Sequence, residues 1–251
     1  MTRQLLILGG TGEARRLAER AIDEFGGRLG VTTSLAGRTA EPVPIAGTVR
    51  QGGFGGAVGL AAYLRDNRID LLIDATHPFA DQISRNAAEA ANAMGVPRLA
   101  VVRPPWRRQP GDRWIEVADA SAAAQSVRGL GRRVWLTLGT ADIEAFAPLT
   151  DHWFLVRRVD PPPAPLPLRQ AEILLARGPF ALGDERRILR EHRIEAMVSR
   201  ASGGAATVAK IDAARDAGIP VVLIVRPPPP PEPTVPTVDA ALAWLRVQLG
   251  A

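Results

Sequence analysis

The sequence contains no cysteine, which excludes disulfide bonds, thiolate chemistry and cysteine-based metal sites. Its three histidines, His77, His152 and His192, do not form the HExxH spacing of a zinc enzyme, so no metal site is expected. No apolar run approaches the roughly 20 residues that a membrane-spanning helix needs, and the start does not resemble a signal peptide. We therefore expect a soluble, cytoplasmic protein without a resident metal.

Aromatic residues are also scarce, at 5% of the chain, although the net charge is +5. The positive charge comes almost wholly from arginine, because Lys210 is the only lysine. A basic balance can indicate a nucleic acid, a membrane surface or an acidic small molecule as the partner. Nucleic-acid binders usually combine a basic run with interleaved aromatic residues. We expect no nucleic-acid or membrane partner, but a small polyanionic substrate bound by a monomer.

The 251 residues, of which 46% are hydrophobic, suffice for one large domain or two smaller ones. Short apolar runs alternate with helical patterns, which predicts parallel sheets covered by helices. Two segments, residues 95–105 and 218–228, share the pattern GxP followed by RPP, at an offset of about 123 residues. The sequence thus predicts an α/β fold of two Rossmann-like, doubly wound parallel-sheet domains that are related by an internal repeat.

We place the boundary between these domains after residue 105, within an arginine–proline stretch. Residues 1–105 are then an N-terminal Rossmann-like domain that binds the nucleotide, and residues 106–251 are a C-terminal Rossmann-like domain. The substrate is expected in a cleft between the two. A proline run over residues 227–231 leaves open whether a late strand or helix crosses to the other half.

The first candidate site lies in residues 5–14, LLILGGTGEA. Four apolar residues, a glycine turn and an amphipathic pattern are typical of a buried strand that leads into a helix. The unpaired N–H groups at such a helix start suit a pyrophosphate. The G-x-G-x-x-G fingerprint is incomplete, because Arg15 stands at the third glycine position, so a turn without a ligand stays an alternative. The residues we assign to the cofactor here are Gly10, Thr11, Gly12, Glu13 and Ala14.

The end of the second predicted strand indicates which dinucleotide is bound. An NAD site usually carries an acidic residue there, but this chain has none before Glu41. Ser34, Arg38 and Thr39 can instead donate to a 2′-phosphate, which favours NADPH, whereas an ordinary solvated loop is the alternative. The residues we assign to this part of the cofactor site are Ser34, Leu35, Ala36, Gly37, Arg38 and Thr39.

A third candidate stretch, DATHPFA at residues 74–80, follows a buried strand at the sheet edge where ligands of α/β folds bind. Pro78 suits the first turn of the helix that we expect to begin here. His77 can supply a proton near neutral pH, although a helix cap with an exposed histidine is equally compatible. We assign Thr76, His77, Pro78 and Phe79 to the cofactor site, with His77 as the catalytic residue.

The corresponding turn of the second half is SRASGG, at residues 199–204. Its backbone N–H groups, its hydroxyls and Arg200 form a plausible carboxylate receptor, and a purely structural loop is the alternative. We assign Arg200, Ser202, Gly203 and Gly204 to substrate binding.

Several of these stretches occur together in one family. In chain order they are ILGGTGEARRLA, SLAGRT, GGFGG with GLAAYL, DATHPFADQISRNAAEA, RPPW, RGPF and SGG-x-x-T-x-x-K. This combination covers nearly the whole chain and resembles the precorrin-6A reductase family of cobalamin biosynthesis. The resemblance implies two Rossmann-like domains and adds Lys210 to the substrate residues. Arg200 and Ala201 depart from the Lys-Asn or Lys-Asp pair that the family pattern leads us to expect.

The resemblance implies an NADPH-dependent oxidoreductase that reduces one C=C bond of the precorrin-6A macrocycle, giving precorrin-6B. The many carboxylates of this tetrapyrrole substrate would explain an arginine-rich site. Two alternatives stay open: the same reduction on cobalt-precorrin-6A, and a regulator that senses NADP without catalysis.

Overall fold

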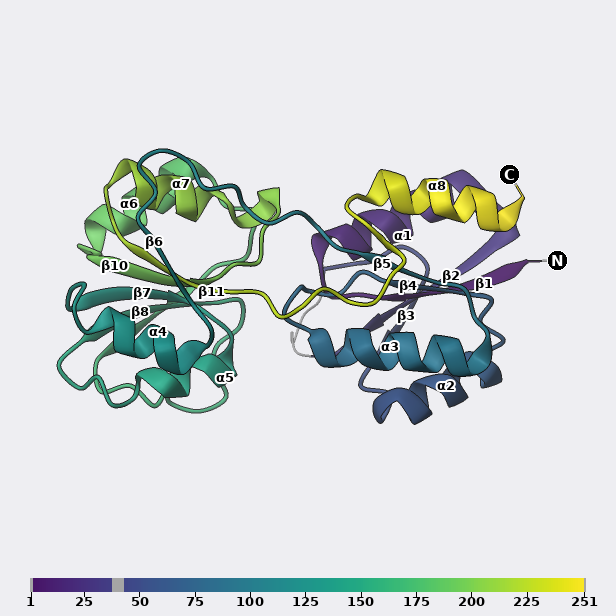
Figure 1. The fold of residues 1–251 in the computed structure, drawn as a ribbon, viewed down its shortest axis with the longest axis horizontal. Helices are drawn as coiled ribbons and strands as arrows, with labels where there is room; N and C mark the ends of the chain where they lie inside the picture. The colour runs from purple at the N-terminus through teal and green to yellow at the C-terminus, as the bar shows by residue number, and fades with distance from the viewer. Residues whose placement is uncertain (1, 38–42, 251) are drawn as a thin grey trace. The chain divides into compact units, whose positions relative to one another are not determined.

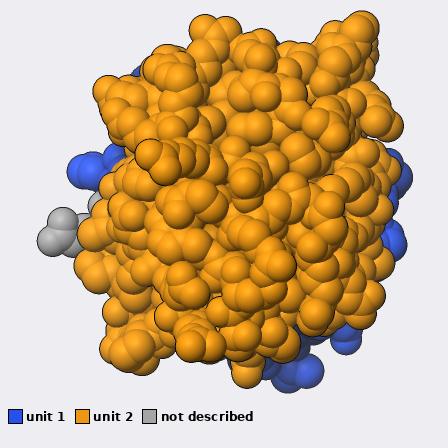
Figure 2. Space-filling model, turned by 90° about the vertical axis from the view of Figure 1, so that its left-hand side faces the viewer, with its two compact units in different colours: residues 1–104, 227–251 blue, residues 105–226 orange. Residues whose placement is uncertain are grey.

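The computed structural model describes residues 2–37 and 43–250, which form two compact units (Figure 1). Unit 1 consists of residues 1–104 and 227–251, and unit 2 consists of residues 105–226; Figure 2 colours the two separately. The chain therefore leaves unit 1, completes unit 2 and returns to unit 1.

The core of unit 1 is a six-stranded parallel sheet in the order β3-β2-β1-β4-β5-β12. Its strands are β1 (Arg3–Leu8), β2 (Leu29–Leu35), β3 (Thr48–Gln51), β4 (Leu71–Asp74), β5 (Arg98–Val101) and β12 (Thr234–Val235). Its helices are α1 (Gly12–Phe25), α2 (Gly56–Asp66), α3 (Asp81–Met94) and α8 (Val238–Leu249), with a 3-10 turn η1 (Gly26–Arg28). This strand order is that of the dinucleotide-binding Rossmann fold.

Helices cover both faces of this sheet (Figure 1). Leu5 and Ile7 of β1 pack with α1 and α8, whereas Leu6 and Leu8 pack with α2 and α3. Successive side chains of a strand point to opposite faces, so a strand that is buried on both faces has an unbroken apolar sequence. This is why residues 5–8 could be identified as a strand from the sequence.

The core of unit 2 is a second six-stranded parallel sheet, in the order β9-β8-β7-β10-β11-β6. Its strands are β6 (Trp114–Val117), β7 (Arg133–Thr137), β8 (Trp153–Arg158), β9 (Ala171–Leu175), β10 (Ala196–Arg200) and β11 (Val221–Ile224). Its helices are α4 (Ala120–Val127), α5 (Thr140–Ile143), α6 (Leu182–Glu191) and α7 (Ala209–Asp216), with 3-10 turns η2 (Glu144–Phe146) and η3 (Ala205–Thr207). The predicted α/β class with two doubly wound parallel sheets is confirmed.

The last strand of each sheet comes from an unexpected part of the chain. β6 follows β5 in sequence but pairs with β11, and β12 follows β11 but pairs with β5. The strand that follows the fifth strand of one sheet thus completes the other sheet. The exchange includes the next helix, since α8 packs on α1 through the buried Leu242 and Leu245.

The exchange determines where the carboxyl-terminal segment belongs. The sequence analysis placed residues 227–251 with the C-terminal domain, whereas in the structure they pack with residues 1–104. Backbone hydrogen bonds join Ala100 N–H to Pro233 O at 3.1 Å and Val102 N–H to Val235 O at 2.8 Å. These contacts and the apolar face of α8 hold the segment in unit 1.

Among the described residues, no helix has the length and apolar character that a membrane crossing requires.

Candidate functional site

The loop between β1 and α1 is shaped to admit an anion. Gly10 has φ +101°, a conformation that strongly favours glycine, and Gly9 N–H donates to Ser34 O at 2.9 Å, which holds the loop against β2. A Cβ at Gly10 or Gly12 would meet no atom of the described residues within 4 Å, so open space lies against the backbone there. This space adjoins the amino end of α1, where backbone N–H groups attract negative charge.

Thr11 fixes the start of α1. Its hydroxyl oxygen accepts a hydrogen bond from Ala14 N–H at 3.1 Å and donates one to Ala75 O at 2.6 Å. The cap uses the third N–H of the helix and leaves those of Gly12 and Glu13, which have no intrahelical partner. Thr11 therefore joins the helix start to the end of β4, with two N–H groups available for a ligand.

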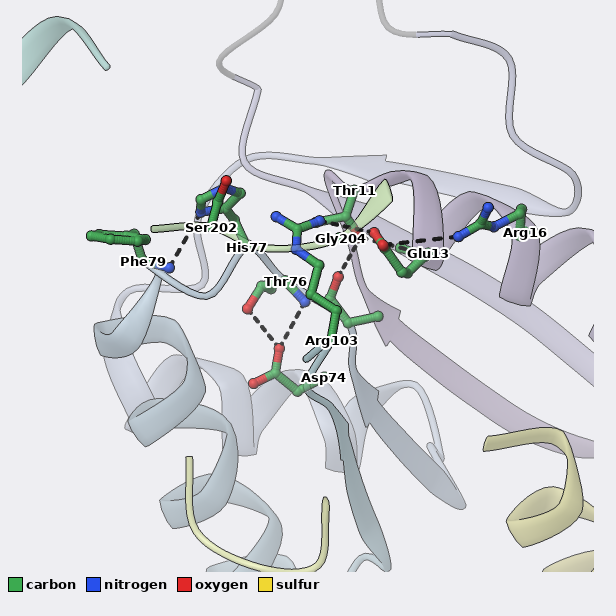
Figure 3. A network of polar contacts seen from close by, with 12 residues as sticks. Thr11, Glu13, Arg16, Asp74, Thr76, His77, Phe79, Arg103, Ser202 and Gly204 are labelled. Carbon is green, nitrogen blue, oxygen red and sulfur yellow. Dashed lines mark hydrogen bonds and ion pairs between the residues drawn. The ribbon is translucent and has the colours of Figure 1, made fainter. Parts of the chain in front are cut away.

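A carboxylate in the first turn of α1 is neutralised by two arginines (Figure 3). Glu13 lies 3.1 Å from Arg103 and 3.8 Å from Arg16, and the side chains of Glu13 and Arg103 are 18% and 15% exposed. The pairing prevents Glu13 from repelling an anion at the helix start. Arg103 follows β5 at the same sheet edge, and sequence reasoning noted its RPPW stretch without assigning it to the site.

The DATHPF stretch forms a tight turn at the end of β4 (Figure 3). Asp74 is only 2% exposed, and its Oδ1 accepts from Thr76 N–H at 3.0 Å and from the Thr76 hydroxyl at 2.7 Å. Phe79 N–H donates to His77 Nδ1 at 3.2 Å, so the neutral imidazole carries its proton on Nε2. A buried carboxylate thus fixes the turn that presents His77.

One expectation about this turn is wrong. Pro78 does not lie in the first turn of α3, because the helix begins at Asp81 and its N-cap residue is Ala80. Ala80 N–H donates to His77 O at 2.7 Å, which closes a separate turn before the helix. Asp74 holds Thr76 in this turn, so Thr76 is not available to cap α3.

The end of β2 is only partly described. Ser34 is buried, and its hydroxyl oxygen accepts from Arg50 Nη1 at 2.9 Å; Leu35 is also buried, and Gly37 has φ +72°. Arg38 and Thr39 lie outside the described residues. Arg50 belongs to β3, a strand that the sequence analysis did not foresee, and was therefore missed.

In unit 2, the loop after β10 is held from several sides. Trp106 Nε1 donates to Gly204 O at 3.0 Å, and Arg226 donates to Ala201 O and Ser202 O, each at 2.7 Å. Gly203 and Gly204 have φ of +62° and +78°, conformations that favour glycine. The side chain of Arg200 lies 2.7 Å from Asp142, so its charge is paired within the unit. The loop is therefore ordered by its own unit.

Lys210 is located in the interior of unit 2. The residue is 7% exposed, and its Nζ donates to Thr137 Oγ1 at 2.9 Å and lies 5.8 Å from the Trp106 ring centroid. Burial, and secondarily the charge of Arg157, lower the pKa of Lys210 to about 7, while Glu185 acts in the opposite direction. Arg157 and Glu185 form a buried ion pair at 2.7 Å.

Within unit 1, Thr11, Glu13, Thr76 and Arg103 gather at the carboxyl ends of β1, β4 and β5 (Figure 3). In a doubly wound sheet this is the edge at which ligands bind. No group of three or more histidine or acidic side chains that could hold a metal ion occurs within residues 2–37 and 43–250. The arrangement suits a phosphorylated ligand, with a titratable histidine beside it.

Comparisons with known proteins agree with this architecture. Residues 4–246 match the family described as precorrin-6x reductase CbiJ/CobK. The precorrin-6A reductase of Rhodococcus erythropolis is 50% identical over 246 residues, which cover 98% of each chain. The cobalt-precorrin-6A reductase of Salmonella typhimurium is 29% identical over 235 residues, covering 90% of this chain and 88% of that protein. A solved structure described as CobK precorrin-6A reductase is similar with a TM-score of 0.90 and 42% identity, covering 100% of this chain and 98% of that one.

Proposed function

The chain belongs to the precorrin-6x reductase family, and we propose that it uses NADPH to reduce metal-free precorrin-6A. Membership makes it a reductase that acts on a C=C bond of a macrocycle in cobalamin biosynthesis. The observation that carries the choice of cofactor class is the open space at Gly10 and Gly12, in front of the amino end of α1.

The amino end of α1 suits a pyrophosphate. The N–H groups of Gly12 and Glu13 are free of intrahelical partners, and the helix dipole adds positive potential at the same place. A side chain at Gly10 or Gly12 would occupy the space that the pyrophosphate needs. We assign the pyrophosphate to residues 10–14, where Arg103 compensates the charge of Glu13.

The end of β2 suits a ribose that carries a 2′-phosphate. Residues 34–39 contain no carboxylate that could accept from an unmodified ribose or repel a 2′-phosphate. Ser34 lies at the carboxyl end of β2, beside the loop that would hold the pyrophosphate. We assign residues 34–39 to the 2′-phosphate, with Arg38 and Thr39 as donors on the basis of the sequence. This assignment makes NADPH, rather than NADH, the cofactor.

The turn after β4 is where we expect the reacting atoms. Saturation of a C=C bond takes a hydride at one carbon, which the nicotinamide supplies when bound, and a proton at the neighbouring carbon. We assign residues 76–79 to the nicotinamide region and His77 to the proton, because the Nε2–H of neutral His77 is a donor. Asp74 acts through Thr76 as a positioning residue.

The substrate brings several carboxylates. The N–H groups of Gly203 and Gly204 and the hydroxyl of Ser202 are suitable donors to one of them, whereas the Ser202 N–H already donates to Arg200 O at 2.7 Å. We propose that Arg200 and Lys210 support this loop without direct contact with the substrate, since Arg200 is paired with Asp142, and the buried Lys210 lies 5.8 Å from the ring of Trp106, which holds Gly204. Five relatives named precorrin-6A reductase are 43–50% identical to this chain, and three named cobalt-precorrin-6A reductase are 26–29% identical, which supports the metal-free substrate. Monomeric state and cytoplasmic location stay predictions of the sequence.

Incubation of the purified protein with NADPH and either precorrin-6A or cobalt-precorrin-6A tests the proposal through the loss of the near-ultraviolet absorbance of NADPH. We expect oxidation only when a corrinoid is present, and faster with the metal-free one. Faster oxidation with the cobalt-containing substrate would reverse the substrate assignment. Binding of NADPH without oxidation in either mixture would favour a regulator that senses the nucleotide.

A further inference from the structure

Arg50 occupies a defined place beside the end of β2. It is the register partner of Ser34 across the β2–β3 pair, so the two side chains leave the sheet on the same face. Its Nη1 donates to Ser34 Oγ at 2.9 Å and to Gly52 O at 2.7 Å, and its Nη2 donates to Gly53 O at 2.9 Å. Arg50 therefore joins the end of β2 to the glycine-rich loop that leads into α2.

Aromatic rings hold the guanidinium group in this position. Its carbon lies 3.8 Å from the ring centroid of Phe54 and 5.1 Å from that of Tyr63. The two rings are themselves in edge-to-face contact, with centroids 5.2 Å apart. Stacking and hydrogen bonds together fix the orientation of Arg50, so little conformational freedom is left to lose on binding a ligand.

The charge of Arg50 has no acidic partner in the part of the chain that the structure describes. Three of the five N–H donors of a guanidinium bind neutral oxygens, and within the same residues no ion pair involves Arg50. Its bond to Ser34 Oγ uses that oxygen as an acceptor, so the hydroxyl hydrogen of Ser34 stays available for donation. A fixed cation and a hydroxyl donor thus lie side by side at the end of β2.

We infer that Arg50 is a specificity-determining residue of the cofactor site, which favours a dinucleotide with a 2′-phosphate over one without it. The inference rests on the proposed function, because it assumes that the adenosine end of the cofactor lies at the end of β2. Arg50 acts in two ways: it orients the Ser34 hydroxyl, and its positive charge and remaining N–H donors attract the phosphate dianion. The glycine-rich loop 52–56 is then part of the cofactor site, held in place by the same side chain.

The test compares Arg50→Met and Arg50→Lys with the control Arg28→Met. Arg28 also lies over a phenylalanine ring, 5.9 Å from the centroid of Phe25, but it precedes β2 and so belongs to the opposite edge of the sheet. Dissociation constants for NADPH, NADH and adenosine 2′,5′-bisphosphate are measured by calorimetry. Circular dichroism and thermal melting establish that each variant is folded.

We expect Arg50→Met to raise the dissociation constants of NADPH and the bisphosphate by roughly tenfold to hundredfold, and that of NADH by less than about threefold. Arg50→Lys keeps the charge but cannot donate to three oxygens in one plane, so an intermediate loss of the NADPH preference is expected. If Arg50→Met does not fold, Arg50→Lys takes its place in the comparison of NADPH with NADH. Arg28→Met should change none of the three dissociation constants.

Two results would overturn the inference: equal losses for NADPH and NADH, which indicate a structural role for Arg50, or unchanged binding of both. Either result would leave the proposed function intact, because the wild-type protein still binds NADPH. A wild-type protein that binds no dinucleotide would instead remove the proposed function, and this inference with it.

Discussion

Replacement of Lys210 by methionine should stabilise the protein at neutral and mildly acidic pH and change its pH dependence. Methionine has a similar length and can fill the same apolar space without a charge. Burial and the charge of Arg157 lower the pKa of Lys210 from 10.5 in a solvated lysine to about 7. Between about pH 7 and pH 10.5 the unfolded chain therefore binds more protons at this site than the folded chain, so the free energy of unfolding rises with pH.

The size of the effect follows from the same difference. One pKa unit corresponds to about 1.4 kcal/mol. The lowered pKa of Lys210 therefore reduces the free energy of unfolding by at most about 5 kcal/mol below pH 7, by less at higher pH, and not at all above about pH 10.5. The variant loses the hydrogen bond from Lys210 to Thr137, which is worth about 1 kcal/mol, while the Thr137 hydroxyl still donates to Val198 O. We expect a gain of up to about 4 kcal/mol near pH 6 and a small loss near pH 10.5.

Urea unfolding at about pH 6 and at about pH 10.5 measures the free energy of unfolding of the variant and the wild-type protein directly. Four of the five tryptophans lie within residues 105–226, so tryptophan fluorescence reports mainly on unit 2. Arg187→Met is the matched control, since that arginine is exposed and pairs with Asp184 on the helix surface. A Lys210→Met protein that is less stable than wild type at pH 6, or has the same pH dependence, would refute the reasoning.

Three further predictions concern the cofactor, the proton and the exchanged helix. In a binding titration, Arg38→Ala should weaken the binding of NADPH at least tenfold more than the binding of NADH. Equal losses of affinity for the two would contradict the phosphate assignment. His77→Ala should lower kcat by about 10²- to 10⁴-fold without weakening NADPH, whereas unchanged turnover would remove His77 from proton transfer. Leu245→Ala should lower the free energy of unfolding by about 2–5 kcal/mol, because Leu245 is fully buried in the core of unit 1. In this variant, amide hydrogen exchange should accelerate in β1 and β4. Acceleration confined to unit 2 would contradict the placement of α8 in unit 1.

Much of the fold could be predicted because its central strands are buried on both faces. The runs at residues 5–8 and 71–73 are continuously apolar, and glycines or polar residues mark where they end. β3, β6 and β12 were not foreseen, since they are short edge strands with mostly exposed or half-buried residues. The exchange of β6 and β12 leaves no local signal, because either half offers an equivalent sheet edge to the strand that follows.

The candidate site divides in a similar way. Thr11 and His77 could be found because glycine turns and strand ends are visible in the sequence. Arg50 and Arg103 were not assigned, because their roles depend on which strands lie side by side: Arg50 contacts Ser34 across β2–β3, and Arg103 contacts Glu13 from the end of β5. For Lys210 the sequence position was noted, but its burial beside Arg157 depends on the packing of α7 on the sheet.

Calorimetric titration of a matched pair of glycine variants shows whether the loop between β1 and α1 holds NADPH. A Cβ at Gly12 or at Gly129 has open space around it, and neither residue has a positive φ, so a side chain can begin at either position without a Cβ clash. Only Gly12 lies at the start of α1, where its side chain would point toward the bound phosphates. We expect wild type and Gly129→Val to bind NADPH, and Gly12→Val, although folded, not to bind it. Equal binding by Gly12→Val, or no binding by the wild-type protein, would contradict this placement of NADPH.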